Sequence, residues 1–156
     1  MLWNFCTREE REWGSVMDVN ISRLKHSYAV ATKMRESVLL SSKIYSCSAN
    51  DMYVLGMLHD IGYGLDEEQK NHAHIGGEIL REQGYKLWKE IYYHGIVQME
   101  YMSQELRLLN HIDMTTGPDG EDMTIQERID DIGLRYGKGS RQEKDAIKLA
   151  EEIKGL

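Results

Sequence analysis

Apolar residues recur along most of this chain at intervals of three or four, which is the period of an amphipathic helix. The longest such pattern covers residues 20–45, and His26 lies just beside its apolar stripe. Alternation of β-branched and polar residues is almost absent, so the sequence offers little material for a sheet. We therefore predict an all-α fold. The stripe on the first long helix consists of Ile21, Leu24, Tyr28, Ala31 and Val38.

Four further segments continue the helical pattern. The first follows Ser48, a plausible N-cap, and places Met52 and Leu55 on one face together with Leu58 or His59. We expect Gly62 and Gly64 to end this helix. The other three segments are HAHIGGEILREQ, which stops at Gly84, KLWKEIYY, which stops near Gly95, and a stretch from about Met99 to His111 that carries Met102, Leu106, Leu109 and Ile112.

The remainder of the chain reads as a turn followed by two helices. TTGPDG has proline and glycine at positions that turns favour. Each of the two helices opens with a capping box, formed by Thr124 with Glu127 and by Ser140 with Glu143. We expect about six or seven helices in a single domain over 1–156, with a core at about 18–114 and C-terminal helices at about 124–154.

Charge and composition limit the classes of partner that we expect. The chain has 156 residues and a formal net charge of −7, which disfavours long-range attraction to a nucleic acid polymer or an anionic membrane. Cys6 and Cys47 form no recognisable framework, and we find neither a signal peptide nor an apolar run long enough to span a membrane. We expect a soluble, cytoplasmic protein whose oligomeric state the sequence leaves open.

Histidine and aspartate stand side by side at the end of an apolar run, as His59 and Asp60. Adjacent residues on a helix point about 100° apart, so both can reach one ion only at a helix end. Imidazole and carboxylate suit a divalent transition metal. Further candidate ligands lie in other segments and can converge only if helices pack around a shared site. These candidates are His26, His72, His94 and Asp113.

The ordered set resembles the HD superfamily of metal-dependent phosphohydrolases. The resemblance rests on His26 in RLKHSYAVA, the His59–Asp60 pair in LGMLHDIG, and Asp113 before MTTGPDG, which together match an H…HD…D signature with the HDIG variant at 59–62. HAHIGGEIL and IYYHGI look like two later histidine segments of HDIG proteins. The tail through ERIDDIGLRYG looks like the end of small stand-alone HD proteins. The resemblance implies a helical bundle around a metal site.

Site roles follow from the resemblance, position by position. His26, His59, Asp60 and Asp113 would be the primary ligands of a divalent metal, and a metal-held hydroxide would be the nucleophile. His72 and His94 match the further histidines of members with two ions, in which Asp60 would bridge. One or two ions are therefore implied, and Mn, Fe, Co, Ni, Mg and Zn all remain open.

Some positions depart from the family pattern or compete with it. GYG follows HDI where the cyclic-dinucleotide phosphodiesterases have GYP, so that substrate is disfavoured. His74 competes with His72, but only His72 has the family spacing to Gly76. A single histidine stands at 94, where many relatives have two. We expect His74 and His111 to be structural or to face solvent.

The implied activity is hydrolysis of a phosphate ester or anhydride in a small molecule, for which a nucleotide is the best candidate. Nucleotide monophosphatases and dinucleoside-polyphosphate hydrolases are the nearest functional analogues of this size. Arg23 and Lys70 are candidate phosphate-binding residues, and Asp60, Asp66 and Lys70 are candidate catalytic residues. Two alternatives stay open: a module that senses a nucleotide without turnover, and an HD-fold di-iron oxygenase.

Overall fold

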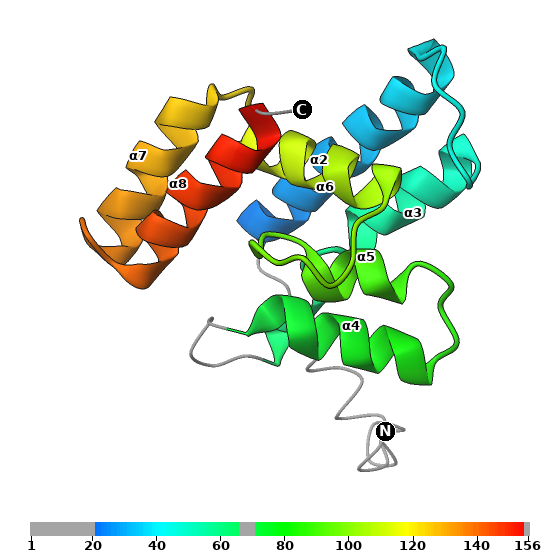
Figure 1. Ribbon diagram of the computed structural model, residues 1–156, viewed down its shortest axis with the longest axis horizontal. Helices are drawn as coiled ribbons and strands as arrows, with labels where there is room; N and C mark the ends of the chain where they lie inside the picture. Colours follow the sequence, from blue (N-terminus) through cyan, green and yellow to red (C-terminus); the bar gives the residue numbers. More distant parts are fainter. Residues whose placement is uncertain (1–20, 66–70, 155–156) are drawn as a thin grey trace, which may run out of the picture.

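The computed structural model describes residues 21–65 and 71–154, and within these ranges it contains seven α-helices and one short 3-10 helix. The predicted all-α fold is confirmed, because the only extended pairing in the described ranges is an isolated bridge between Thr116 and Asp122. The elements are α2 (Ile21–Leu40), α3 (Ala49–Leu58), η1 (Ile61–Gly64), α4 (His72–Glu82), α5 (Trp88–Tyr93), α6 (Gln104–Met114), α7 (Ile125–Tyr136) and α8 (Arg141–Lys154) (Figure 1).

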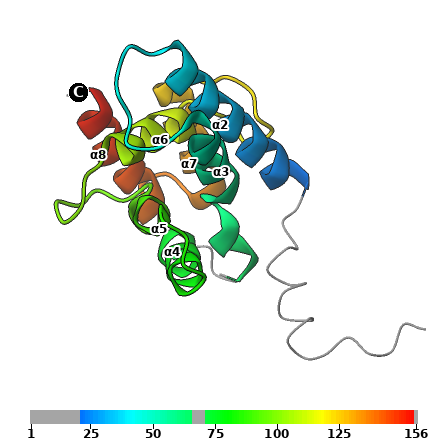
Figure 2. The same cartoon turned by 90° about the vertical axis from the view of Figure 1, so that its right-hand side faces the viewer.

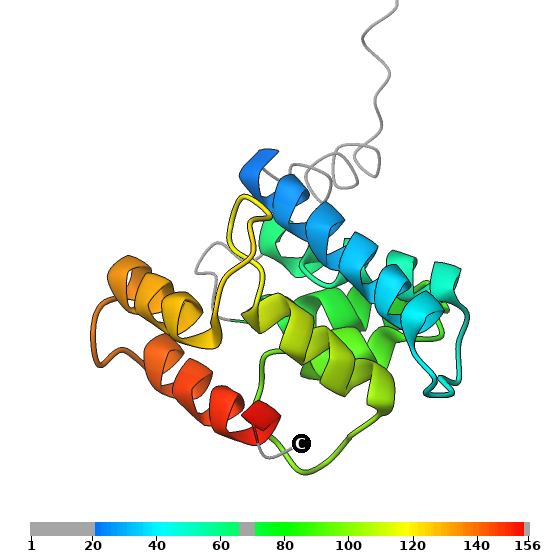
Figure 3. The ribbon, with the colours of Figure 1, turned by 90° about the horizontal axis from the view of Figure 1, so that it is seen from above.

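The helices form pairs around α6. α2 packs along α3, and α4 packs along α5, with η1 lying against α4 (Figures 1 and 2). α7 and α8 form an antiparallel hairpin, which meets the remaining helices through α6 (Figure 3). No helix in the described ranges is both long enough and apolar enough to cross a membrane.

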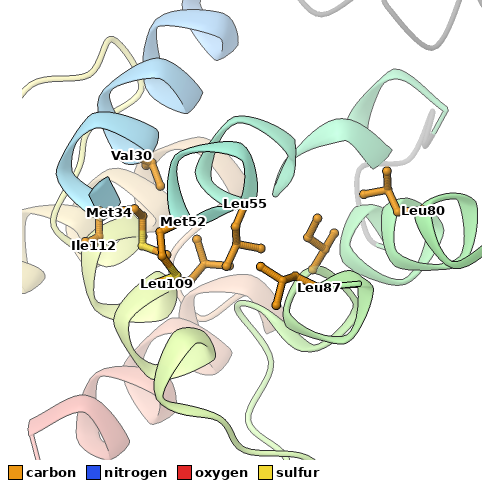
Figure 4. Packing of buried hydrophobic residues seen from close by; sticks show 9 residues of the cluster. Val30, Met34, Met52, Leu55, Leu80, Leu87, Leu109 and Ile112 are labelled. Atoms are coloured by element: carbon orange, nitrogen blue, oxygen red, sulfur yellow. The ribbon is translucent and has the colours of Figure 1, made fainter. Parts of the chain in front are cut away.

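Two separate hydrophobic clusters hold these pairs together. The larger joins α2, α3, α4, α5 and α6, and Met34 of α2 lies close to Met52 of α3 and Ile112 of α6 within it (Figure 4). The smaller lies beneath the hairpin and joins α7 and α8 to the end of α6. Its buried members are Met114, Ile129, Ala146, Leu149 and Ala150.

The predicted stripe on α2 is wrong in its first half. Ile21, Leu24 and Tyr28 are exposed, whereas His26 and Ser27 are buried with the face that continues through Val30, Ala31 and Met34. The period of three and four is present, but the buried face lies on the side of His26. Hydrophobicity alone missed this because the first turns of α2 cover a polar site.

The predicted helix after Ser48 is confirmed, and its end shows why Gly62 is a glycine. Ser48 and Asp51 form a capping box, and α3 ends at Leu58, so that His59 and Asp60 lie where the chain turns into η1. The two glycines lie within η1 and do not stop α3. A Cβ on Gly62 would overlap the carbonyl oxygen of His72 and lie 2.8 Å from the nitrogen of Gly76. Gly62 therefore lets η1 touch the start of α4.

The C-terminal predictions are largely confirmed. Thr124 and Glu127 form the expected capping box. The Ser140 hydroxyl accepts a bond from the backbone N–H of Glu143, but the Glu143 carboxylate turns to the N–H of Gly139, so the second box is half formed. The helix predicted from Met99 begins at Gln104, after Ser103 caps it.

Asp66, Lys70 and the residues 18–20 lie outside the described ranges.

Candidate metal centre

Six side chains from five elements converge at one end of the larger cluster. His26 comes from α2, His59 and Asp60 from the end of α3, and His94 from the end of α5. His72 opens α4 and Asp113 lies in the last turn of α6. His26, His59, Asp60 and His94 are buried, and His72 and Asp113 are half-buried. These are the six residues to which the sequence analysis gave metal roles.

Backbone carbonyls fix the orientation of three of the imidazoles. Nδ1 of His26 donates to the carbonyl of Gly117 at 2.9 Å, Nδ1 of His59 to Gly56 at 2.7 Å, and Nδ1 of His94 to Ile91 at 2.6 Å. Because a carbonyl can only accept, Nδ1 carries the proton in each ring. In the neutral ring the lone pair is then on Nε2, which faces the carboxylates. This is the arrangement that a metal-binding histidine adopts.

The carbonyl that orients His26 comes from the predicted turn. The backbone N–H of Gly120 donates to the carbonyl of Gly117 at 3.0 Å, with Pro118 between them and a positive φ of 88° at Gly120. The Ser22 hydroxyl donates to the carbonyl of Pro118 at 3.0 Å, which fastens the turn to α2. The turn therefore places a fixed acceptor behind the imidazole of His26.

The first group of donor atoms surrounds Asp113. Its Oδ1 lies 3.0 Å from Nε2 of His26 and 3.8 Å from Nε2 of His59. Nε2 of His59 has no hydrogen-bond partner among the described residues, although it is fully buried. His26, His59 and Asp113 each offer one atom within 4.8 Å of the others, close enough to share one cation.

The second group surrounds Asp60. Its Oδ1 lies 3.5 Å from Nε2 of His59 and 3.6 Å from Nε2 of both His72 and His94, while its Oδ2 lies 3.9 Å from Nε2 of His26. The Nε2 atoms of His72 and His94 are 3.3 Å apart. Two nitrogens bound to one ion at about 2.1 Å are separated by about 3.0 to 3.4 Å, so this pair fits a single cation. Asp60 lies between both groups.

Both carboxylates are held in the charged form. Burial raises the pKa of Asp60, but the neighbouring imidazoles of His59 and His94 outweigh it and hold that pKa well below its usual range. Burial likewise opposes ionisation of Asp113, but the neighbouring imidazoles of His26 and His59 outweigh it and hold its pKa well below the usual range. Two ionised carboxylates therefore face four imidazoles.

The histidines divide by environment. Burial lowers the pKa of His26 and of His94, but the neighbouring carboxylates outweigh it and raise both above the ordinary value. Burial lowers the pKa of His72 to about 3, so this ring is neutral near neutral pH. His72 also differs in that its buried Nδ1 has no hydrogen-bond partner among the described residues.

These residues fit a divalent cation. Nε2 of His59 is buried without a hydrogen bond and faces two ionised carboxylates, which is costly for an isolated polar atom and natural for a metal ligand. Nitrogen and oxygen donors in this proportion suit Mn, Fe, Co, Ni or Zn, and the carboxylates also suit Mg.

Three side chains outside the ligand set complete the surroundings. Arg23 pairs with Oδ2 of Asp60 at 3.2 Å, and its guanidinium lies 3.3 Å from the centre of the Tyr63 ring. The other face of Tyr63 is stacked on His72, with the ring centroids 3.9 Å apart. Arg128 of α7 lies 3.9 Å from Oδ1 of Asp113. A cavity of about 760 Å³ opens from the centre between these side chains and the α7–α8 hairpin.

The structure separates the remaining candidates. Arg23, a candidate phosphate-binding residue, lies at the centre, where it pairs with Asp60. His74 packs against Tyr92 with ring centroids 4.4 Å apart, and His111 is exposed on α6, which agrees with non-ligand roles. Sequence reasoning missed Tyr63 and Arg128. The first stands inside the HDIG segment as part of GYG, whereas no spacing rule connects the second to Asp113.

Comparison with known proteins decides the family. The HD domain family model matches residues 23–132, which is more than half of the chain and includes all six convergent residues and Arg128. The chain belongs to the HD domain family. HD domains are generally metal-dependent hydrolases that bind divalent cations, and the histidine and aspartate cluster of this HD domain could hold one. No curated protein and no solved structure gives a significant match.

Proposed function

We propose that this HD domain protein is a metal-dependent phosphohydrolase that cleaves a phosphate ester or anhydride, with a nucleotide as the preferred substrate class. One observation carries the proposal. Three imidazoles donate from Nδ1 to backbone carbonyls and direct Nε2 at two ionised carboxylates, and one of these Nε2 atoms is buried without a partner. A fully formed donor set of this kind supports a cation site better than a structural ion-pair network does.

The donor atoms fall into two sets that share Asp60. His26, His59 and Asp113 would hold one cation together with Asp60, whose Oδ2 is the carboxylate oxygen nearer to His26. His72, His94 and Oδ1 of Asp60 would hold a second. Bound cations would lower the pKa of a water molecule and draw charge from a phosphoryl oxygen.

The reaction adds water across a P–O bond. The water oxygen forms a new bond to phosphorus, the bond to the leaving oxygen breaks, and the leaving oxygen gains a proton. The negative charge that spreads over the phosphoryl oxygens needs cationic neighbours. Arg23 supplies one, because its guanidinium is held between Asp60 and Tyr63 and borders the cavity. Asp66 stays proposed as a catalytic residue, and Lys70 stays proposed as a catalytic and phosphate-binding residue.

Metal loading and a substrate panel test the proposal. Protein stripped of metal and reloaded with Mn, Co or Fe is incubated with nucleoside mono- and polyphosphates, and released phosphate or nucleotide is measured. We expect turnover that disappears in Asp60→Asn and His59→Ala. His111→Ala is the matched control, because His111 is exposed on α6 and should keep full activity.

Two outcomes would contradict the proposal. Intact nucleotide recovered after long incubation with protein shown to contain metal would favour a sensing module. Oxygen uptake on substrate addition by the iron-loaded protein, without phosphate release, would favour the oxygenase alternative.

A further inference from the structure

One wall of the cavity is basic, although the chain as a whole is acidic. The α7–α8 hairpin supplies this wall, and its cationic residues outnumber the single carboxylate, Asp145, that it adds to the lining. A local positive field of this kind attracts an anion despite a net charge of −7. The cations of the wall are Arg128, Arg135, Arg141 and Lys148.

Arg128 is the innermost cation of this wall and is held in place. One terminal nitrogen lies 3.3 Å from the carboxylate of Asp131, and the other lies 3.9 Å from Oδ1 of Asp113. Its Nε is buried and has no partner among the described residues. A planar guanidinium with an unused donor beside a cation site suits a phosphate group, whose oxygens can accept two parallel hydrogen bonds.

The cations continue outward from the metal centre. Arg135 is seven residues after Arg128, two turns along the same face of α7, and also pairs with Asp131 at 2.6 Å. Side-chain exposure rises from 13% at Arg128 to 38% at Arg135 and 90% at Arg141. Asp131 therefore holds two guanidinium groups in a row that leads from Asp113 toward solvent.

We infer that the substrate carries two or more linked phosphates, and that Arg128 and Arg135 bind the phosphate next to the one at the metal centre. This inference rests on the proposed function and narrows it to a phosphoanhydride. Hydrolysis would then place the water oxygen on one phosphorus, break the bridging P–O bond, and leave the proton on the departing phosphate. A monophosphate could reach the metal centre but would leave the outer cations without a ligand.

Binding of two inorganic probes tests the inference without any turnover. Orthophosphate and methylenediphosphonate, which cannot be hydrolysed, are titrated calorimetrically into manganese-loaded protein at one fixed free manganese concentration. We expect the diphosphonate to bind at least about tenfold more tightly. Arg128→Gln should weaken the diphosphonate about ten- to hundredfold, because a hydrogen bond to a charged group is lost, and should change orthophosphate much less.

Two further variants keep the test decisive. Arg135→Gln changes a partly exposed side chain, so we expect it to leave the fold and the metal centre intact. It should also reduce the preference for the diphosphonate. Arg107→Gln, exposed on α6 and outside the cavity lining, should leave both affinities unchanged. Equal affinity for the two probes, or no binding of the diphosphonate, would overturn the inference. Tight, Arg128-dependent binding with no hydrolysis of any phosphate ester or anhydride would overturn the proposed function instead.

Discussion

The Tyr63 ring lies almost parallel to the imidazole of His72, with the planes at 15° and the centroids 3.9 Å apart. The other three convergent imidazoles donate Nδ1 to a backbone carbonyl, but Nδ1 of His72 has no partner among the described residues. Stacking on Tyr63 therefore fixes the orientation of the His72 ring, as the hydrogen bonds fix the orientation of the other three rings. We therefore infer that Tyr63 positions His72 for the second of the proposed cations.

Loss of this stack should weaken the second cation selectively. In Tyr63→Ala we expect about a ten- to hundredfold loss of affinity for one ion per chain, as for other residues that support a metal ligand. Tyr63→Phe keeps the ring and should keep two ions. Elemental analysis after dialysis at graded metal concentrations gives the stoichiometry, and a Tyr63→Ala protein that still holds two ions as tightly as the unmodified chain would refute the role.

Gly62 should tolerate no side chain. In Gly62→Ala the new methyl group meets the backbone of His72 and Gly76, which cannot rotate away, so we expect a loss of about 1 to 3 kcal/mol in the free energy of unfolding. Gly133→Ala on α7 is the matched control. The atoms nearest to its methyl belong to the flexible Glu143 side chain, and alanine favours a helix by up to about 1 kcal/mol. Urea unfolding of both variants compares them, and equal destabilisation would contradict the contact.

Metal should stabilise the folded chain strongly. Because the donor atoms come from five separate elements, an unfolded chain cannot assemble the site, and bound metal adds about 2.7 kcal/mol when its concentration is a hundred times Kd. Thermal unfolding with and without a chelator should show a clear fall in Tm. The same comparison in His59→Ala should show a much smaller difference, and a Tm that is indifferent to the chelator in the unmodified chain would count against the site.

Glu105 should make stability depend on acid pH. The buried carboxylate accepts from the backbone N–H and the hydroxyl of Ser46 at 2.8 and 2.6 Å. Burial raises the pKa of Glu105, but these bonds outweigh it and lower that pKa below the ordinary value. Its contribution is thus present above the unfolded pKa and is lost as pH falls through the folded pKa.

Substitution of this carboxylate gives the measurement. We expect Glu105→Gln to lower the free energy of unfolding by about 1 to 3 kcal/mol at neutral pH, since bonds to a charged acceptor are lost. The difference from the unmodified chain should shrink toward pH 3. A difference that is independent of pH would contradict this account.

The helices and the convergence of the ligand candidates were predicted from different kinds of sequence information. Caps such as Ser48 and Thr124 act through neighbouring backbone, so spacing alone located these helix starts. The convergence of His26 with Asp113 depends on packing between α2 and α6, which no local pattern encodes, and only the family resemblance brought them together. Arg128 was not predicted for the same reason, because its importance depends on its closeness to Asp113, which no local pattern encodes.

The hydrophobic cluster beneath α7 and α8 is separate from the one that supports the six convergent side chains. Changes on the cavity face of the hairpin are therefore expected to leave the larger cluster, which supports the six convergent side chains, intact. We therefore expect that substitutions in this one hairpin would change substrate preference, in evolution or in the laboratory, while the proposed hydrolytic chemistry is retained.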